Sequence, residues 1–175
     1  MQAITNICFQ NTIGTFITAK TWLSCIKNPP VHIDKKAESV SLVIIGSEAG
    51  VMGVPGNADY AASKSAIQYG LMLSISAEAV SVRPDARVNA VAPGAVNTPQ
   101  FQQECAAEGS GALQWFEAEA TVASRRPVDP SHVARTCLLL ASSNLSGSTN
   151  GQIIRVDAGK SGRMFWDNNG NPTWK

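Results

Sequence analysis

The feature that most constrains the fold is an apolar run followed by a long helical stretch and a second, similar run. Residues 41–45, Ser-Leu-Val-Ile-Ile, form a continuous apolar segment with β-branched residues. A strand of that composition is typically covered on both faces, as in a parallel sheet. Residues 87–92 read as a second strand and residues 152–157 as a third. Strands that alternate with helices predict a parallel α/β layer.

The other segments divide into helices and loops. Helices are expected over residues 3–26, 60–81 and 129–142. The first ends at Asn28-Pro29-Pro30, and the last begins with Asp129 as N-cap and Pro130 in the first turn. Residues 46–59 are expected to form a Gly- and Pro-containing loop, and residues 95–126 a helical, lid-like region. Residues 160–175 receive no assignment.

Composition and charge exclude several classes of function. The 175 residues carry a formal net charge of +1, which argues against nucleic acid or anionic lipid as a partner. No stretch is apolar for about 18 residues, so we expect no membrane span. The N-terminus lacks a basic region followed by an apolar run, so we expect no signal peptide and a cytoplasmic location.

The cysteines and histidines give no metal signature. Cys8, Cys25, Cys105 and Cys137 have no CxxC spacing, and the two histidines of the chain are distant from them in sequence. Zinc sites bring such ligands together at short, regular spacings. We therefore expect reduced thiols and no metal.

The strongest chemical signal is Tyr60-Ala61-Ala62-Ser63-Lys64, with Ser47 thirteen residues upstream of Tyr60. On a helix, Tyr60 and Lys64 share one face. A nearby ammonium favours the phenolate, which makes a phenol a better acid and base near neutrality. Ser47, directly after the first strand and Gly46, could hold a substrate oxygen against the Tyr60 hydroxyl.

Several further segments agree with this pattern. They include residues 11–16, Asn-Thr-Ile-Gly-Thr-Phe, then residues 87–94, which end in Pro93-Gly94, and Thr98. Residues 126–134 and the closing residues 156–159 belong to the same set. Together with Ser47 and the Tyr60/Lys64 pair, they resemble the short-chain dehydrogenase/reductase family over residues 3–159.

The resemblance implies an NAD(P)-dependent oxidoreductase that moves hydride between the cofactor and a carbonyl/alcohol pair. It makes Tyr60 the acid/base, Lys64 the partner that also holds the nicotinamide ribose, and Ser47 the residue that positions the substrate oxygen. Asn11 would maintain a water linked to Lys64. The implied cofactor contacts are Tyr60, Lys64, Pro93, Gly94 and Thr98. Plainer roles remain open: Thr98 as a helix N-cap, Ser47 as a loop cap, and Asn11 as a locally bonded helix residue.

The same resemblance implies a Rossmann-like, doubly wound parallel α/β sheet that is incomplete, because the N-terminal strands and Gly-rich phosphate loop are missing. The loop Gly46–Gly53 lacks GxGxxG spacing and does not replace it. We expect one partial domain over residues 1–175. Three hypotheses stay open: an active enzyme, an inactive remnant or interaction subunit, and an incomplete gene model.

Partners can be predicted only in outline. Phe101, Trp115 and Phe116 in the lid-like region favour an apolar substrate, or else simply pack the lid on the body. Small residues on the helix over residues 60–81 allow close approach of another helix, and apolar side chains spread around it. We therefore expect a homo-oligomer that forms through the helices over residues 3–26 and 60–81.

Overall fold

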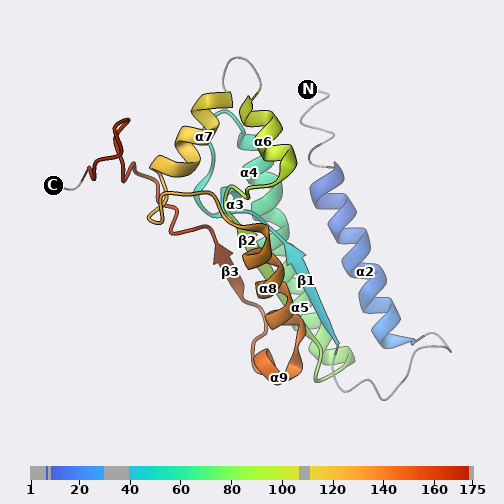
Figure 1. The fold of residues 1–175 in the computed structure, drawn as a ribbon. Coiled ribbons are helices and arrows are strands. Elements are labelled where there is room, and N and C mark those ends of the chain that lie inside the picture. The colour runs from blue at the N-terminus through green and yellow to red at the C-terminus, as the bar shows by residue number, and fades with distance from the viewer. Residues whose placement is uncertain (1–6, 8, 30–39, 107–110, 174–175) are drawn as a thin grey trace.

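The computed structural model describes residues 7, 9–29, 40–106 and 111–173. Within them, three parallel strands form one sheet in the order β1-β2-β3. The strands are β1 (Ser41–Ile45), β2 (Arg87–Pro93) and β3 (Ile153–Val156). The expected incomplete parallel α/β sheet is confirmed, with the third strand slightly shorter than predicted. All three strands point toward α6 (Pro99–Ala106) and α7 (Gly111–Ala120), so their carboxyl ends meet below this lid (Figure 1).

Helices lie on both faces of the sheet. In Figure 1, α8 crosses in front of the strands while α5 runs behind them and α2 stands beside β1. The helical elements outside the lid are η1 (Phe9–Ile13), α2 (Gly14–Lys27), α3 (Ala49–Met52), α4 (Ala58–Ser65), η2 (Ala66–Leu71), α5 (Met72–Val82), α8 (Pro130–Ala141) and α9 (Ser143–Ser146).

Two elements differ from the sequence prediction. The helix expected over residues 60–81 begins at Ala58 and contains a π-helical stretch, η2, between α4 and α5. The loop expected over residues 46–59 holds the short helix α3. The first helix is confirmed from Phe9 to Lys27, and residues 3–6 and 8 of its predicted range lie outside the described residues. The N-cap of α8 is confirmed, because Asp129 Oδ1 accepts a hydrogen bond from Ser131 N at 2.7 Å.

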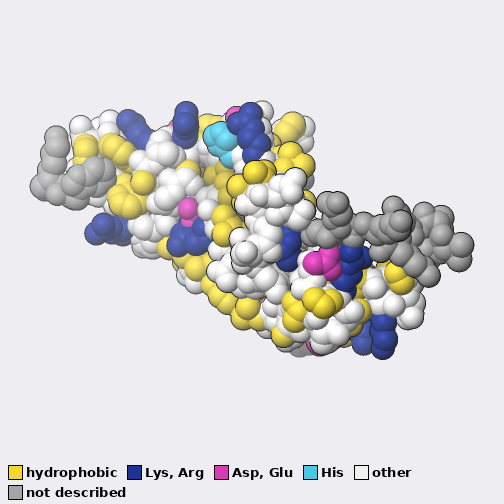
Figure 2. Space-filling view, turned by 90° about the horizontal axis from the view of Figure 1, so that it is seen from below, with side chains coloured by type: hydrophobic (Ala, Val, Ile, Leu, Met, Phe, Trp, Pro, Cys, Tyr) yellow, Lys and Arg dark blue, Asp and Glu magenta, His cyan; other side chains and the backbone are white. Residues whose placement is uncertain are grey.

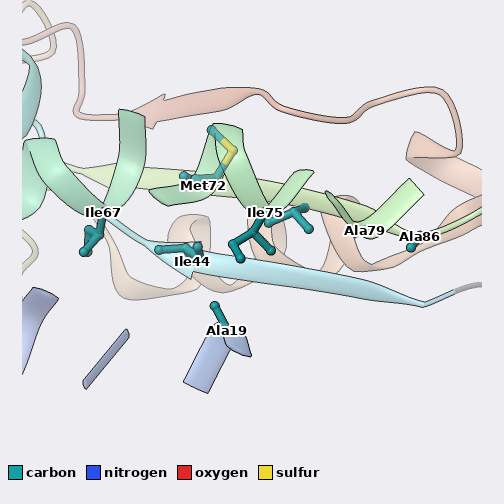
Figure 3. Packing of buried hydrophobic residues seen from close by; sticks show 9 residues of the cluster. Ala19, Ile44, Ile67, Met72, Ile75, Ala79 and Ala86 are labelled. Carbon is teal, nitrogen blue, oxygen red and sulfur yellow. The ribbon is translucent and has the colours of Figure 1, made fainter. Parts of the chain in front are cut away.

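The core lies between the sheet and the α2/α5 side. Its buried members come from α2, β1, β2 and the helical segment over residues 58–82, and Ala86 joins them from the turn before β2 (Figure 3). They are Ala19, Ile44, Ile67, Met72, Ile75, Ala79, Ala86, Val88 and Ala90. Four alanines stand in this list beside larger aliphatic side chains, which fill the space between the helices and the sheet.

Strand β1 is less covered than its composition predicts. Ile44 is 4% exposed, but its neighbour Ile45, on the opposite face, is 47% exposed. Among the described strands, β1 pairs only with β2, so it forms one edge of this sheet. The prediction from composition that both faces of this strand are covered is therefore wrong at Ile45. The described elements do not cover the end of this edge strand.

Buried polar residues join the loops to the sheet. Asn89, on β2, donates to Thr149 O and accepts from Gln152 N, and so joins β2 to the segment before β3. Arg87, at the start of β2, is buried and donates to Leu140 O at 2.8 Å and to Ser146 O at 3.0 Å. A cation at the carboxyl end of α8 is stabilised by the helix carbonyls.

The segment that the sequence left unassigned packs against the end of α7 and the residues that follow it. Lys160 pairs with Val122 in an isolated antiparallel β-bridge, and Trp166 Nε1 donates to Val122 O at 3.1 Å. Seen from the amino ends of the strands, Lys and Arg side chains are dispersed among hydrophobic ones (Figure 2). None of the helices in the described part of the chain has the length and apolar character to cross a bilayer.

We predict that Arg87→Leu lowers the free energy of unfolding by about 3 kcal/mol, because several buried carbonyls lose a charged donor. Arg135→Leu, the same change at an exposed position of α8, should shift it by less than about 0.5 kcal/mol. Denaturant unfolding of both variants measures the difference. Equal effects of the two substitutions would contradict the role given to Arg87.

Candidate active site

Ser47 follows β1 at the carboxyl edge of the sheet. Gly46 N donates to Val91 O at 2.8 Å and Glu48 N donates to Pro93 O at 2.9 Å, so the β1–β2 ladder continues through the loop. Between them, Ser47 is 8% exposed and its N–H points away from β2 to Gln68 Oε1 at 2.9 Å. The loop position of Ser47 is therefore held from both sides.

Tyr60 and Lys64 lie side by side on α4, as their spacing predicts. Lys64 Nζ is 5.7 Å from the centroid of the Tyr60 ring and donates to Ile45 O at 3.2 Å. Ile45 is two residues before Ser47, so the ammonium connects the α4 pair to the strand end that carries Ser47. Burial lowers the pKa of the half-buried Lys64 ammonium below its usual value.

Asn11 comes to the same helix from η1. Its Nδ2 donates to Ser63 Oγ at 3.0 Å, and Ser63 Oγ donates to Tyr60 O at 2.8 Å. Ser63 is 2% exposed. Asn11 thus bonds across 52 residues of sequence to the residue beside Lys64, in addition to the local bond that its backbone carbonyl accepts from Thr15 Oγ1.

The hydroxyl of Ser47 has a loop-capping contact. Ser47 Oγ accepts from Ala49 N at 3.1 Å, which is the plainer role left open by the sequence. A hydroxyl that accepts one hydrogen bond still carries a proton to donate. The capping contact is therefore compatible with a second role toward a substrate oxygen.

The predicted cofactor contacts beyond α4 also serve the fold. A Cβ on Gly94 would lie 3.0 Å from Asp157 Cα and 3.0 Å from Glu48 Oε2, so close packing favours glycine there. Thr98 Oγ1 accepts from Phe101 N at 3.1 Å and caps α6, the alternative that the sequence left open. Pro93 is buried at the end of β2. A contact of Pro93, Gly94 or Thr98 with a cofactor stays a prediction.

Sequence reasoning missed Glu48, which lies at the centre of a charged cluster. Its side chain is 13% exposed, Oε1 lies 3.9 Å from Lys160 Nζ, and buried Oε2 has no hydrogen-bond partner in the described part of the chain. Burial raises the pKa of Glu48 to about 7, against the attraction of Lys160 and with a further contribution from Asp157. An acidic residue directly after Ser47 was the available sequence signal.

The lid is built on stacked rings. Phe101 of α6 and Trp115 of α7 have ring centroids 5.9 Å apart and planes inclined at 29°. Trp115 also borders a cavity of about 860 Å³ whose lining includes Arg126, His132 and Arg155. Ser47, Tyr60 and Lys64 do not line this cavity. At least two of the three lid rings therefore pack on each other.

No metal centre is apparent in the part of the chain that the structure describes, since no three His, Cys, Asp or Glu side chains gather there. The three described cysteines, Cys25, Cys105 and Cys137, are free.

Comparison with known proteins agrees with this fold. A family model described as "Enoyl-(Acyl carrier protein) reductase" matches residues 10–161. In the solved structure of a 3-hydroxyacyl-CoA dehydrogenase type-2 from Mycobacterium avium, the match has a TM-score of 0.74 at 25% identity and covers 93% of this chain and 58% of that one. The chain belongs to the short-chain dehydrogenase/reductase family of oxidoreductases.

Two curated relatives show how much of the family's length is present. The 3-oxoacyl-[acyl-carrier-protein] reductase FabG of Thermotoga maritima is 34% identical over 128 residues, which are 71% of this chain and 46% of that protein. The short-chain dehydrogenase/reductase homolog YusR of Bacillus subtilis is 34% identical over 131 residues, 72% of this chain and 87% of that protein. The chain thus spans less than half the length of the FabG relative.

We predict that Glu48 makes stability depend on pH. When folding raises the pKa of a carboxyl from 4.5 to about 7, the folded state is more stable with that carboxyl protonated than with it ionised. Its contribution is therefore fully present below about pH 4.5 and is lost as pH rises through about 7, a loss of about 3 kcal/mol. Glu48→Gln should remove this loss between about pH 5 and pH 8, as measured by denaturant unfolding.

The matched control is Glu117→Gln, which removes another carboxylate near Lys160 whose side chain is 58% exposed. This variant should keep the pH dependence of the unmodified chain. The assignment to Glu48 would be wrong if Glu48→Gln and the unmodified chain lost the same stability over that range.

Proposed function

We propose that this chain carries the proton-transfer half of an oxidoreductase site that acts on a carbonyl/alcohol pair with NAD(P) as cofactor. The observation that carries the proposal is Lys64, whose Nζ lies beside the Tyr60 ring while it binds Ile45 O, two residues before Ser47. A phenol, a desolvated ammonium and a hydroxyl thus gather at one strand end. Positioned acids and bases of this kind contribute most when their pKa lies near the working pH.

Each residue has a distinct part in the reaction. In reduction, Tyr60 gives its hydroxyl proton to the substrate oxygen, and Ser47 Oγ donates a hydrogen bond to the same oxygen. Lys64 stabilises the phenolate that remains. Asn11, through Ser63 and the turn of α4 that carries Tyr60, holds the helix in position. In oxidation the proton returns to Tyr60.

The described residues fit one end of a nicotinamide cofactor, which would supply the hydride. Lys64, with Tyr60, would hold the nicotinamide ribose, because its ammonium is half-buried at the strand ends. The fit stops at the pyrophosphate. In the Gly-containing loop over residues 46–53, an added Cβ on Gly46 or Gly50 would meet the Gln68 side chain. The chain's own packing therefore accounts for these glycines.

The alternative is a chain without turnover that acts as an interaction subunit. The edge position of β1 and the exposure of Ile45 favour it, because paired strands normally cover such an edge. The preference between NAD and NADP, an apolar substrate and a cytoplasmic location remain predictions.

The decisive test is a titration of the purified chain with NADH and NADPH, followed by nicotinamide fluorescence and paired with gel filtration of the same sample. We expect saturable binding by a discrete species, and a screen of carbonyl substrates then follows. Tyr60→Phe should abolish turnover and leave cofactor affinity within about twofold, because the phenol moves a proton without dominating binding. Absence of saturable binding, or turnover retained by Tyr60→Phe, would refute the proposal.

We further propose that the chain forms a homo-oligomer through α2 and the helical segment over residues 58–82. Large apolar side chains are exposed on both: Phe16 at 46% and Ile17 at 56% on α2, and Leu73 at 46% and Val80 at 40% on α5. The two helices are neighbours beside β1 (Figure 1). Exposed apolar surface shared by adjacent helices is typical of an interface.

Ile17→Glu should convert the oligomer to a monomer, because a charge would be buried without a partner at its centre. Asn144→Glu, on exposed α9, is the matched control and should leave the molecular mass unchanged. Gel filtration with light scattering measures both. An unmodified chain that is already monomeric, or an Ile17→Glu variant of unchanged mass, would refute this interface.

A further inference from the structure

Two backbone groups at the carboxyl end of β1 face away from its partner strand. Successive residues of a strand point in opposite directions. Gly46 N and Glu48 N bond to β2, so the polar groups of Ile45 and Ser47 face the opposite side. In the described part of the chain that side holds helices and no strand. A buried N–H without a partner is costly, so Ser47 N requires an acceptor from elsewhere.

Side chains four residues apart on one helical segment meet these groups. Lys64 Nζ donates to Ile45 O at 3.2 Å, and Gln68 Oε1 accepts from Ser47 N at 2.9 Å. The Gln68 oxygen must face Ser47, because a backbone N–H can only donate. Lys64 is a proposed catalytic residue, whereas the function proposed above gives Gln68 no role.

Gln68 is held in an unusual way. It is 0% exposed, and its Nε2 has no hydrogen-bond partner in the part of the chain that the structure describes. An unsatisfied buried donor costs about 1–3 kcal/mol, which a leucine of similar size would not incur. Gln68 also lies in the π-helical stretch η2, where Met72 N reaches back to Ile67 O. Such stretches are rare and occur often at functional sites.

The loop that carries Ser47 is shaped around this amide. A Cβ on Gly46 would lie 2.1 Å from Gln68 Oε1, and a Cβ on Gly50 would lie 2.8 Å from Gln68 Nε2. Any larger residue at either position would displace the Gln68 side chain or the loop. The glycines and the buried glutamine therefore form one arrangement. Within the described residues, the Gln68 side chain makes one hydrogen bond, which it accepts from Ser47 N.

We propose that Gln68 is the positioning residue of Ser47. By accepting the Ser47 N–H, it sets the backbone of the loop and hence the direction in which the Ser47 hydroxyl can meet a substrate oxygen. The functional half of this inference rests on the role proposed for Ser47 above. The structural half, the bond from Ser47 N to Gln68 Oε1, can be tested without cofactor or substrate.

The first experiment measures amide hydrogen exchange by NMR on the full chain. The readout is the exchange rate of Ser47 N–H relative to that of Glu48 N–H, which bonds to Pro93 O and corrects for overall stability. Gln68→Leu should raise this ratio about tenfold or more. Ser76→Ala, which removes another buried polar group of the same helical segment, should leave it unchanged. An unchanged ratio in Gln68→Leu overturns the inference.

Two further variants separate the acceptor from packing and from failure to fold. Gln68→Glu keeps an oxygen acceptor and should retain the slow exchange of Ser47 N–H. If it exchanges as fast as Gln68→Leu, the acceptor is not what holds the loop, and the inference is wrong. Should Gln68→Leu not fold, Gly46→Ala displaces the Gln68 amide from the other side. It should raise the same ratio, and an unchanged ratio overturns the inference.

Kinetics distinguish this inference from the proposed function. If the unmodified chain turns over, Gln68→Leu should lower kcat about tenfold and leave the KM for the cofactor unchanged, with recovery in Gln68→Glu. Faster Ser47 exchange with an unchanged kcat would overturn the catalytic importance of the bond. If the unmodified chain has no turnover, the proposed function fails, while the exchange ratio still decides whether Gln68 holds Ser47.

Discussion

The parallel pairing of β1 with β2 is the interaction on which the site depends. Its register, Ser41 opposite Arg87 through Ile45 opposite Val91, brings the loop of Ser47 and the turn at Gly94 to one edge. Every residue of β2 is buried, so a one-residue shift of register would turn Arg87 and Asn89 to the opposite face, away from the partners that they bond. The hydrogen bonds of Gly46 and Glu48 then extend this pairing to either side of Ser47. The candidate chemistry is thus a continuation of the sheet.

The opposite edge of β1 poses the complementary problem. Strand edges carry unpaired N–H and C=O groups, which must find other partners when helices cover them. At the carboxyl end of β1, Lys64 and Gln68 supply these partners from one helical segment. Lys64 therefore has a structural as well as a proposed catalytic part. Partial burial lowers the pKa of the Lys64 ammonium where it bonds to Ile45 O, although the Ile45 side chain itself is exposed.

Local sequence signals predicted most of the framework and less of the site. Apolar runs gave the strands, and the Asp129-Pro130 cap gave the start of α8, because both signals act within a few residues. The Tyr60/Lys64 spacing predicted their shared face. The π-helical stretch and the role of Gln68 were not predictable, since the bond to Ser47 N spans 21 residues and depends on the glycine loop above it. The exposure of Ile45 agrees with the predicted incomplete sheet, in which the first strand has an unpaired edge and an uncovered apolar face.

Two buried polar groups near Ser47 indicate that the position of this loop is held at a cost to the stability of the fold. On one side Gln68 Nε2 and on the other Glu48 Oε2 are buried without partners in the described part of the chain. Apolar residues of similar volume would avoid both desolvation penalties. Polar groups that are costly to bury, in or bonded to one loop, are typical of functional sites, where desolvation is tolerated for geometry. Two of the three buried polar atoms that lack a partner in the described residues thus belong to the Ser47 loop and its glutamine contact, which is a physical reason to seek the chemistry there.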